Sequence, residues 1–538
     1  MSQSELPKPL LENMREQRID ADLTLSILDN YNAGKYDNVQ PVTAAGIPTV
    51  DGDTIIDRTV PAGLRLPLNS VRRQLEALLP SVSVESVATV EGAECVFSEE
   101  QLRDLGRRLL PLVSYGVLNG GSATSYADEK KNRSLSKDLF DLLRGDFQPL
   151  AEMSRGRAKG LTPAYLNPDG SPGATFLELK MRANLVQALQ YQRAAAAGSR
   201  SAGPGEAACD AGSSAPGLLP LFPMFQMTSV YNTDEVAAAY DGFRDSSMLK
   251  GLIAATGIDI TRVLTGVQPL IAAYTHGEAG RPKRIFDRAH GRPNNALPLP
   301  GGHGQNFAVL RETYRELYRM GKRFVYLGNV DNLGFTVDEV SVAYLALTGK
   351  QAGFDFSFRT SVDVKGGILV RDRSDRLACA DIGPAISAEE VFSAEARGSR
   401  ILFNCATGLF ALDYLVRQLD RIIDELPMRF SDQDKDAGRY SQAEQVTWEI
   451  IGMLDDFLIF GVNKYDRFLA AKMLLETLMT SGRKLDSAAY PTDSNPAANL
   501  QLTAHRLHDG LVRRLQSSYA LHLQHGRWEP LAPAEITP

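Results

Sequence analysis

The chain has 538 residues, 43% of them hydrophobic and 23% charged, with a formal net charge of −7 at pH 7. This length allows a large core in more than one domain, and the acidic balance argues against a general binder of nucleic acid or anionic membranes. The chain has no uninterrupted apolar run of about 18 residues, so no membrane span is predicted. The cysteines form no C-x-x-C pair. The N-terminal stretch MSQSELPKPLLENMREQ lacks the apolar core of a signal peptide, so we expect a cytoplasmic protein.

Residues 1–108 are predicted to form an N-terminal helical and irregular region. The stretches LPLNSVRRQLEALLP and SEEQLRDLGRRLLPL carry apolar side chains at helical spacing. Ser98 precedes two acidic residues, so we expect it to cap the second of these helices.

Residues 109–430 alternate strand-like and helix-like segments, which predicts an α/β catalytic domain. Within it, residues 194–217 are rich in Ala, Gly and Ser and predict a flexible surface loop. Residues 431–538 are expected to be helical, with the helices in AEQVTWEIIGMLDDFLIF, YDRFLAAKMLLETLMTSG and NLQLTAHRLHDGLVRRLQSSYALHL.

The stretch RFVYLGNVDNLG, residues 323–334, reads as an apolar strand that runs into Asn329 and Asp331. A helical stretch, GQNFAVLRETYRELYRMG, precedes it, and Thr336 and Glu339 form a capping-box pattern after it. The polar residues therefore lie where a strand passes into a helix, and open α/β sheets bind ligands at that edge. A plain polar turn is the alternative.

The stretch SYGVLNGGSATSY, residues 114–126, repeats this arrangement with glycines. Gly120 and Gly121 allow a tight bend, and successive amides in such a bend can bind an anion. An ordinary tight turn also explains this stretch.

Six strings occur in one order along the chain: LNGG, MTSVYNTDE, PGGHG, GNVDNLGFTVD, DVKGGILV and FN. This series resembles the UTP–glucose-1-phosphate uridylyltransferase family and, more broadly, the eukaryote-type UDP-sugar pyrophosphorylases. The similarity covers residues 110–415 and a segment at 467–472. It implies a nucleotide-diphospho-sugar transferase core, which is a Rossmann-like, mixed and mostly parallel sheet with helices on both faces.

The resemblance also implies the reaction of UTP with a sugar 1-phosphate to give a UDP-sugar and pyrophosphate. Both reactants are polyanions, so we expect Mg²⁺, lysines and backbone amides to hold them for in-line attack at the α-phosphorus. Asp331 is the expected Mg²⁺ ligand, because Mg²⁺ takes one or two carboxylates together with phosphates and water. A turn or helix-capping aspartate is the alternative.

The resemblance assigns nucleotide binding to the glycine loop and three further segments. The loop cradles uracil and phosphates, Gln268 reads the base, Met227 packs beneath it, and His303 stands between glycines. A loop glutamine, a core methionine and a structural histidine remain open alternatives. The full set is Leu118, Asn119, Gly120, Gly121, Met227, Gln268, Gly302 and His303.

The sugar and its phosphate are assigned to Asn329, Lys365, Gly367 and Asn404. Lys472 follows Phe468 at helical i, i+4 spacing and is expected to contact a phosphate. A lysine extending from an apolar helix face explains that spacing equally well.

The chain departs from the family at three places. Its glycine loop has Ala123 where the family has glycine, and Lys131 lacks the usual preceding proline. If residues 126–155 are an insertion, Lys159 is the phosphate-binding lysine; Lys131 is the alternative. The segment FNCATGLF also differs from the family's F-N-T-N-N-L-W. The C-terminal region has no hexapeptide repeat, so a β-helical tail is not predicted.

The sequence thus predicts a Mg²⁺-dependent uridylyltransferase acting on UTP and a sugar 1-phosphate, with glucose 1-phosphate favoured by DVKGG. UDP-N-acetylglucosamine formation is the alternative within this chemistry. A catalytically weak, nucleotide-binding regulatory homologue is the alternative outside it, motivated by the altered glycine and lysine loop. The sequence does not predict the oligomeric state.

Overall fold

A computed structural model of the chain describes residues 3–37, 39, 42–201, 221–360, 363, 366–494 and 499–537. Its centre is a ten-stranded sheet. Eight of the strands follow the order β1-β18-β12-β15-β11-β5-β6-β7, and the other two are β13, which pairs with β15, and β14, which pairs with β13. The strands are β1 (Ile55–Asp57), β5 (Val113–Leu118), β6 (Met224–Ser229), β7 (Leu264–Gln268), β11 (Phe324–Asn329), β12 (Ala352–Phe358), β13 (Gly367–Arg371), β14 (Leu377–Asp381), β15 (Leu402–Ala411) and β18 (Phe457–Val462).

The pairing of these strands is mostly parallel. The pairs β1–β18, β12–β18, β5–β11, β5–β6 and β6–β7 are parallel, whereas β15 runs antiparallel to both β11 and β12. The predicted mixed, mostly parallel α/β fold is therefore confirmed.

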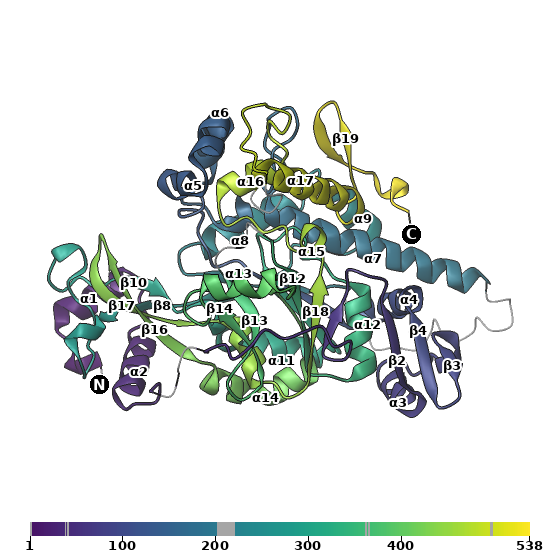
Figure 1. The fold of residues 1–538 in the computed structure, drawn as a ribbon, viewed down its shortest axis with the longest axis horizontal. Coiled ribbons are helices and arrows are strands. Elements are labelled where there is room, and N and C mark those ends of the chain that lie inside the picture. Colours follow the sequence, from purple (N-terminus) through teal and green to yellow (C-terminus); the bar gives the residue numbers. More distant parts are fainter. Residues whose placement is uncertain are drawn as a thin grey trace.

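Helices cover both faces of the sheet (Figure 1). In β11, Phe324 and Tyr326 pack into one hydrophobic cluster while Val325 and Leu327 pack into another, as the alternation of strand side chains requires. The first cluster joins the sheet to α4 (Glu99–Leu109), α7 (Phe176–Ser201), α12 (Glu339–Thr348) and α17 (Leu500–Ser517). The second joins it to α11 (Arg311–Arg319) and α14 (Leu412–Glu425).

The N-terminal region contributes more than helices. It contains α1 (Lys8–Glu16), α2 (Ala21–Asn32), α3 (Leu68–Leu78) and the antiparallel strands β2 (Gly63–Pro67), β3 (Thr89–Glu91) and β4 (Glu94–Ser98). Ser98 caps α4 as predicted, in a reciprocal capping box with Gln101. Strand β1 joins the central sheet, so this region shares the central core; the boundary at 108 remains a prediction.

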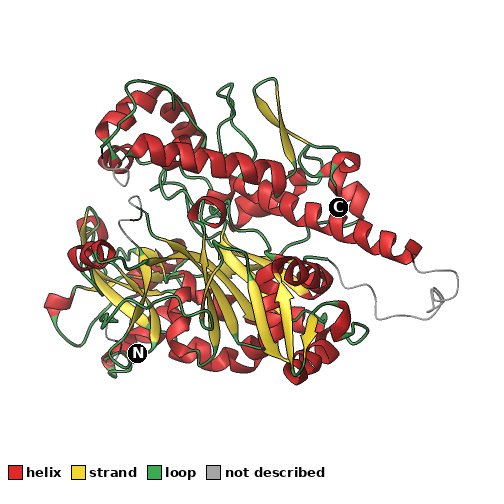
Figure 2. Cartoon of the chain, turned by 45° about the vertical axis from the view of Figure 1, so that its right-hand side comes forward, coloured by secondary structure: helices red, strands yellow, loops and turns green. Residues whose placement is uncertain are grey.

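The expected helix over AEQVTWEIIGMLDDFLIF is wrong. Its residues, 443–460, form the end of β17 (Gly438–Gln445), a 3₁₀ segment at Thr447–Met453 and most of β18, and β16 (Met428–Lys435) precedes them. Every residue of β18 is buried between β1 and β12, so its continuous apolar run is that of an interior parallel strand. Helices follow only later, as α15 (Lys464–Arg467), α16 (Leu474–Thr480) and α17, and Figure 2 shows the long helices as a layer over the sheet.

Three local expectations are also corrected. Residues 194–201 continue α7, and the rest of the predicted loop, 202–217, lies outside the described residues. The helix expected over residues 304–321 is divided into α10 (Asn306–Val309) and α11. Helix α12 follows Asp338 rather than Thr336, whose carbonyl instead accepts a hydrogen bond from Arg467.

The remaining elements surround this core. They are α5 (Glu129–Leu135), α6 (Lys137–Ser154), α8 (Thr233–Phe243), α9 (Lys250–Thr256), α13 (Ala388–Ala396), β8 (Leu270–Ala272), β9 (Tyr274–Thr275), β10 (Pro298–Pro300), β19 (Leu521–Gln524) and β20 (Arg527–Pro530). Among the described residues, no helix has both the length and the apolar character needed to cross a membrane.

Candidate active site

The ends of four neighbouring parallel strands, in the order β11-β5-β6-β7, form one edge of the sheet. Leu118, Gln268 and Asn329 are the last residues of β5, β7 and β11. In the strand register, Leu118 lies between Asn329 on one side and Met227 on the other. Four predicted ligand-binding segments thus meet at the edge where α/β sheets bind ligands.

A cavity of about 880 Å³ lies at this edge. It is lined by six of the predicted site residues, which come from five separate segments of the chain. They are His303, Asn329, Asp331, Gly367, Asn404 and Lys472. Lys365 lies outside the described residues.

Asp331 is half-buried at this cavity and makes no hydrogen bond or ion pair with the described residues. Its neighbour Asn332 fixes the loop instead, since its Oδ1 accepts from the amides of Gly334 at 2.9 Å and Leu469 at 3.0 Å. Lys180 of α7 donates to the carbonyl of Phe335 at 2.9 Å and to that of Asn332. The loop is therefore held rigidly while the Asp331 carboxylate stays available.

Within the described ranges, no group of three His, Cys, Asp or Glu side chains is placed to hold a metal ion. A cation at Asp331 would therefore need most of its ligands from substrate phosphates and water. Mg²⁺ binds proteins in that manner, so the residues present fit this ion.

His303 lies in a 3₁₀ turn against Thr447. The Thr447 amide donates to His303 Nδ1 at 3.1 Å, and the Thr447 hydroxyl donates to the His303 carbonyl at 2.9 Å. An amide can only donate, so Nδ1 is unprotonated and Nε2 carries the hydrogen. Burial lowers the pKa of His303 to about 4, so the ring is a neutral donor at physiological pH.

The glycine loop is fixed to residues 157–160. Buried Asn119 accepts from the Gly160 amide at 3.1 Å through Oδ1, and the Gly121 carbonyl accepts from the Lys159 amide at 3.0 Å. The chain thus leaves the loop, forms α5 and α6, and returns beside it. This path is the one expected if residues 126–155 are an insertion.

Gln268 faces the glycine loop across the sheet edge. Its Nε2 donates to the Gly302 carbonyl at 2.7 Å and to Gln305 Oε1 at 2.9 Å. A Cβ on Gly120 would lie 3.1 Å from Gln268 Oε1, so these two residues are in contact. Gly302 has a φ of +82°, and a Cβ there would lie 2.3 Å from the Gln445 carbonyl oxygen, so this turn requires glycine.

The two candidate lysines differ in their surroundings. Lys159 is buried, its Nζ donates to the Ala471 carbonyl at 3.0 Å, and the same atom lies 2.8 Å from the centroid of the Tyr126 ring. Burial lowers the pKa of Lys159 to about 7, against the opposing effect of the Asp331 charge. Lys131 is exposed and bonds Ser125 Oγ at 2.7 Å.

Lys472 is exposed and lines the cavity, with Nζ 5.9 Å from the Phe403 ring centroid. It lies in the non-helical connection between α15 and α16, so the expectation that Phe468 and Lys472 share a helix face is wrong. Asn404 Oδ1 accepts from the Ala406 amide at 2.8 Å, and its Nδ2 donates to Cys379 Sγ at 3.4 Å.

An aromatic wall of the cavity was missed by the sequence reasoning. Tyr31 and Tyr36 reach it from the N-terminal region and Phe430 from β16. Their ring centroids lie 4.4 Å (Tyr31–Phe430) and 5.8 Å (Tyr36–Phe430) apart. Arg281, whose guanidinium carbon is 4.7 Å from the Tyr31 centroid, bonds Asp37. No sequence motif marks this wall, because its residues are about 400 positions apart.

The profile of the UTP--glucose-1-phosphate uridylyltransferase family matches residues 284–503. The predicted resemblance to this family is confirmed. A probable UTP--glucose-1-phosphate uridylyltransferase of Schizosaccharomyces pombe is 33% identical over 73 residues, or 13% of this chain and 14% of that protein. The matches to the curated relatives span between 14% and 26% of those proteins' own lengths.

Solved structures with the same fold cover more of the chain. UDP-glucose pyrophosphorylase of Leishmania major superposes with a TM-score of 0.51 at 16% identity, covering 88% of this chain and 78% of that one. The uridine diphosphate N-acetylglucosamine pyrophosphorylase of Trypanosoma brucei gives a TM-score of 0.54 at 14% identity, covering 100% and 88%. The fold is therefore that of the UDP-sugar pyrophosphorylases.

Proposed function

We propose that this protein is a uridylyltransferase that forms a UDP-sugar and pyrophosphate from UTP and a sugar 1-phosphate, with glucose 1-phosphate as the first candidate. The observation that carries the proposal is the meeting of the glycine loop, Gln268, Asn329 and Asp331 at the ends of adjacent parallel strands. The family match over residues 284–503 supports it.

The uracil ring would lie beside the contact between the glycine loop and Gln268. Both protons of the Gln268 amide are engaged by Gly302 and Gln305, which directs the Oε1 acceptor toward Gly120. Uracil offers one ring N–H donor between two carbonyls, so an acceptor held in this way favours uracil over bases that present an acceptor there. Leu118 and Met227 are buried in the hydrophobic cluster below this edge and would support the base from beneath.

The phosphates would extend toward Asp331 and the lysines. Mg²⁺ at Asp331 would screen the phosphate charges and polarise the α-phosphoryl group. Lys472 reaches the cavity from the α15–α16 connection, and Lys159 lies beside the glycine loop. Both are suited to offset negative charge on the phosphates, and no covalent nucleophile is needed.

The sugar would lie on the side of His303, Asn329 and Asn404. The neutral His303 ring has its Nε2–H free of the Thr447 contacts, so it can donate to a sugar or phosphate oxygen. The aromatic wall of Tyr31, Tyr36 and Phe430 can cover the apolar face of a pyranose ring.

One observation favours the second candidate, a catalytically weak nucleotide binder. The Lys159 ammonium is already occupied by the Tyr126 ring and the Ala471 carbonyl, and Lys159 is not among the residues that line the cavity. A lysine held in this way must leave both partners before it can contact a phosphate.

The deciding experiment measures pyrophosphate release from UTP and Mg²⁺ with a panel of sugar 1-phosphates that includes glucose and N-acetylglucosamine. ATP, GTP and TTP serve as nucleotide controls. Release with UTP and one sugar establishes the reaction and names the substrate. Calorimetric binding of UTP without release with any sugar overturns the proposal and establishes the second candidate.

A further inference from the structure

A second cavity, of about 560 Å³, begins where the Asp331 loop ends. Thr336, Val337 and Asp338 line it, and in the described chain it has no lining residue in common with the first cavity. Five arginines reach it from different parts of the sequence: Arg58, Arg103, Arg107, Arg467 and Arg514. Four carboxylates line it as well, from Glu99, Asp338, Glu339 and Asp466.

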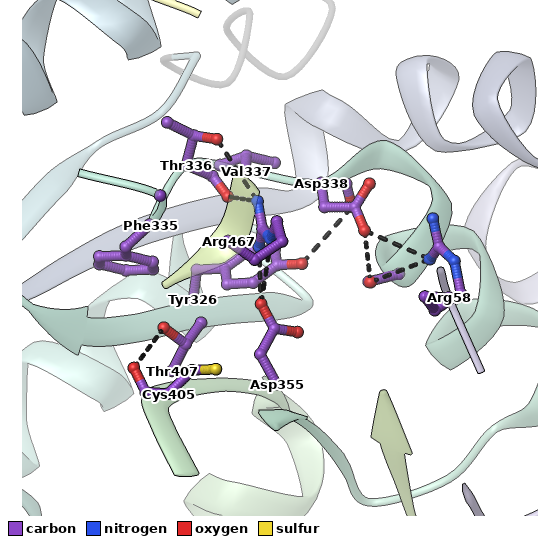
Figure 3. Close-up of polar contacts among 12 residues, drawn as sticks. Arg58, Tyr326, Phe335, Thr336, Val337, Asp338, Asp355, Cys405, Thr407 and Arg467 are labelled. Carbon is purple, nitrogen blue, oxygen red and sulfur yellow. Dashed lines mark hydrogen bonds and ion pairs between the residues drawn. The ribbon is translucent and has the colours of Figure 1, made fainter. Parts of the chain in front are cut away.

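Most of these charges are paired with each other or with a buried neighbour. Arg103 bonds Glu99 at 2.6 Å, and Arg58 Nη1 lies 3.3 Å from Asp338 Oδ2. Arg467 Nη2 lies 2.8 Å from the buried Asp355. Figure 3 shows Arg467 between Thr336 and Asp355, with Asp338 between Tyr326 and Arg58.

Arg514 lacks a carboxylate partner among the described residues. Its Nε donates to the Asp466 carbonyl at 2.7 Å and its Nη1 to Ser518 Oγ at 3.1 Å. Burial and the neighbouring Arg467 charge lower the pKa of Arg514. Of the neighbouring guanidinium groups of Arg467 and Arg514, only that of Arg467 is neutralised by a carboxylate.

Arg58 supplies the second observation. Its side chain is 10% exposed, and its Nε is buried without a hydrogen-bond partner in the described chain. That Nε is closed to a ligand in the cavity, but Arg58 Nη2 makes no hydrogen bond with the described residues and can take a further acceptor. An oxyanion in the cavity would supply acceptors to both Arg58 and Arg514.

We propose that this cavity binds the phosphate group of a small metabolite. Guanidinium groups match the geometry of phosphate oxygens and form charge-assisted bonds with them. The volume exceeds that of the phosphate group itself, so the rest of a phosphomonoester fits beside Gln187, Gln190 and Ser517, which also line the cavity.

The contacts of Arg467 link this cavity to the first one. Arg467 Nη1 donates to the Thr336 carbonyl at 3.0 Å, and its own carbonyl accepts from Asn332 Nδ2 at 3.0 Å. A Cβ on Gly334 would lie 2.3 Å from Arg467 backbone carbon, so the loop packs tightly on this residue. If the proposed function holds, phosphate at this cavity alters UTP affinity through the Asp331 loop.

The test is an isothermal titration of the full chain with inorganic phosphate. Arg514→Gln is expected to weaken the affinity roughly 10-fold to 100-fold, the effect of one charge-assisted bond. Arg103→Gln, at a side chain 42% exposed, provides a second variant that keeps the fold. Arg506→Gln is the matched control, because Arg506 is an exposed arginine of the same helix, α17, that does not line the cavity.

Lys472→Gln distinguishes phosphate binding at this cavity from binding at the first, because Lys472 lines the first cavity and not this one. The proposal expects phosphate affinity within about 2-fold of wild type in Arg506→Gln and Lys472→Gln. It is overturned if phosphate does not bind saturably, if Arg514→Gln and Arg103→Gln both bind normally, or if Lys472→Gln abolishes binding. Failure of the pyrophosphate assay leaves these outcomes unchanged, because the titration does not depend on turnover.

Discussion

The two cavities lie at opposite ends of one loop, and they differ in the charged groups nearest to that loop. In the first, the side chains of Asp331 and Lys472 make no hydrogen bond or ion pair with the described residues. In the second, Arg58, Arg103 and Arg467 each have a carboxylate within 3.3 Å. Charged groups left available suit a reaction on polyanions, whereas paired groups mainly hold the surrounding segments together.

This comparison predicts that substitutions in the second cavity affect stability and those in the first affect turnover. The largest stability effect is expected for Arg467→Met, because it leaves the Asp355 carboxylate, 4% exposed, without its partner. Loss of one partner of a buried ion pair costs about 3–5 kcal/mol in the free energy of unfolding. Urea denaturation of the wild type and the variant measures this loss in the free energy of unfolding.

Arg513→Met is the control for Arg467→Met. Arg513 is 52% exposed in its ion pair with Asp466, so the free energy of unfolding should change by less than about 1 kcal/mol. Equal losses in the two variants would show that the buried pair contributes no more than a surface pair.

Asp331→Asn tests the first cavity. The carboxylate makes no bond that holds the fold, so the melting temperature should stay unchanged while Mg²⁺-dependent kcat/KM falls by about 100-fold to 1000-fold. The control is Asp375→Asn at an exposed turn. Activity near wild type in Asp331→Asn would remove this residue from the site.

Lys159→Ala is expected to lower kcat/KM at least ~100-fold, the effect of losing one charge-stabilising donor. Lys131→Ala should have little effect, because Lys131 is exposed and bonds only Ser125. The reverse result would place the phosphate-binding lysine on α5 and contradict the insertion of residues 126–155.

The last prediction concerns the pH dependence of kcat/KM. The pKa of Lys159 near 7 lies below the ordinary lysine value of 10.5, so the free protein loses this charge as pH rises through 7. kcat/KM for UTP should therefore fall above pH 7, by up to about 10-fold per pH unit. Lys159→Arg should lack this step, because arginine stays charged. A wild-type profile that is flat between about pH 6 and pH 9 would contradict this role.

The sequence predicted the strands that end at the first cavity because their motifs are local. Both β5 and β11 are short apolar runs followed by glycine or polar residues, and a pattern of this kind is visible without knowing the partners of the strand. The capping of α4 by Ser98 is local in the same sense.

Features that depend on distant partners were not predictable in this way. The apolar run of β18 has the composition of a buried helix, and only its pairing with β1 and β12 makes it a strand. The second cavity is built from arginines of four separate regions, at 58, 103–107, 467 and 514, so no single motif marks it. The aromatic wall is also built from residues of distant segments, so no single motif marks it.

The pairing of β1 with β18 also has a consequence for synthesis on the ribosome. Ile55 and Ile56 pair with Ile459 and Phe460, so β1 is made about 400 residues before the only strand it joins in the described sheet. At 5–20 residues per second this delay is roughly 20–80 s. Throughout it Ile55 and Ile56 lack the strand they pair with, so β1 can join the sheet only late in synthesis.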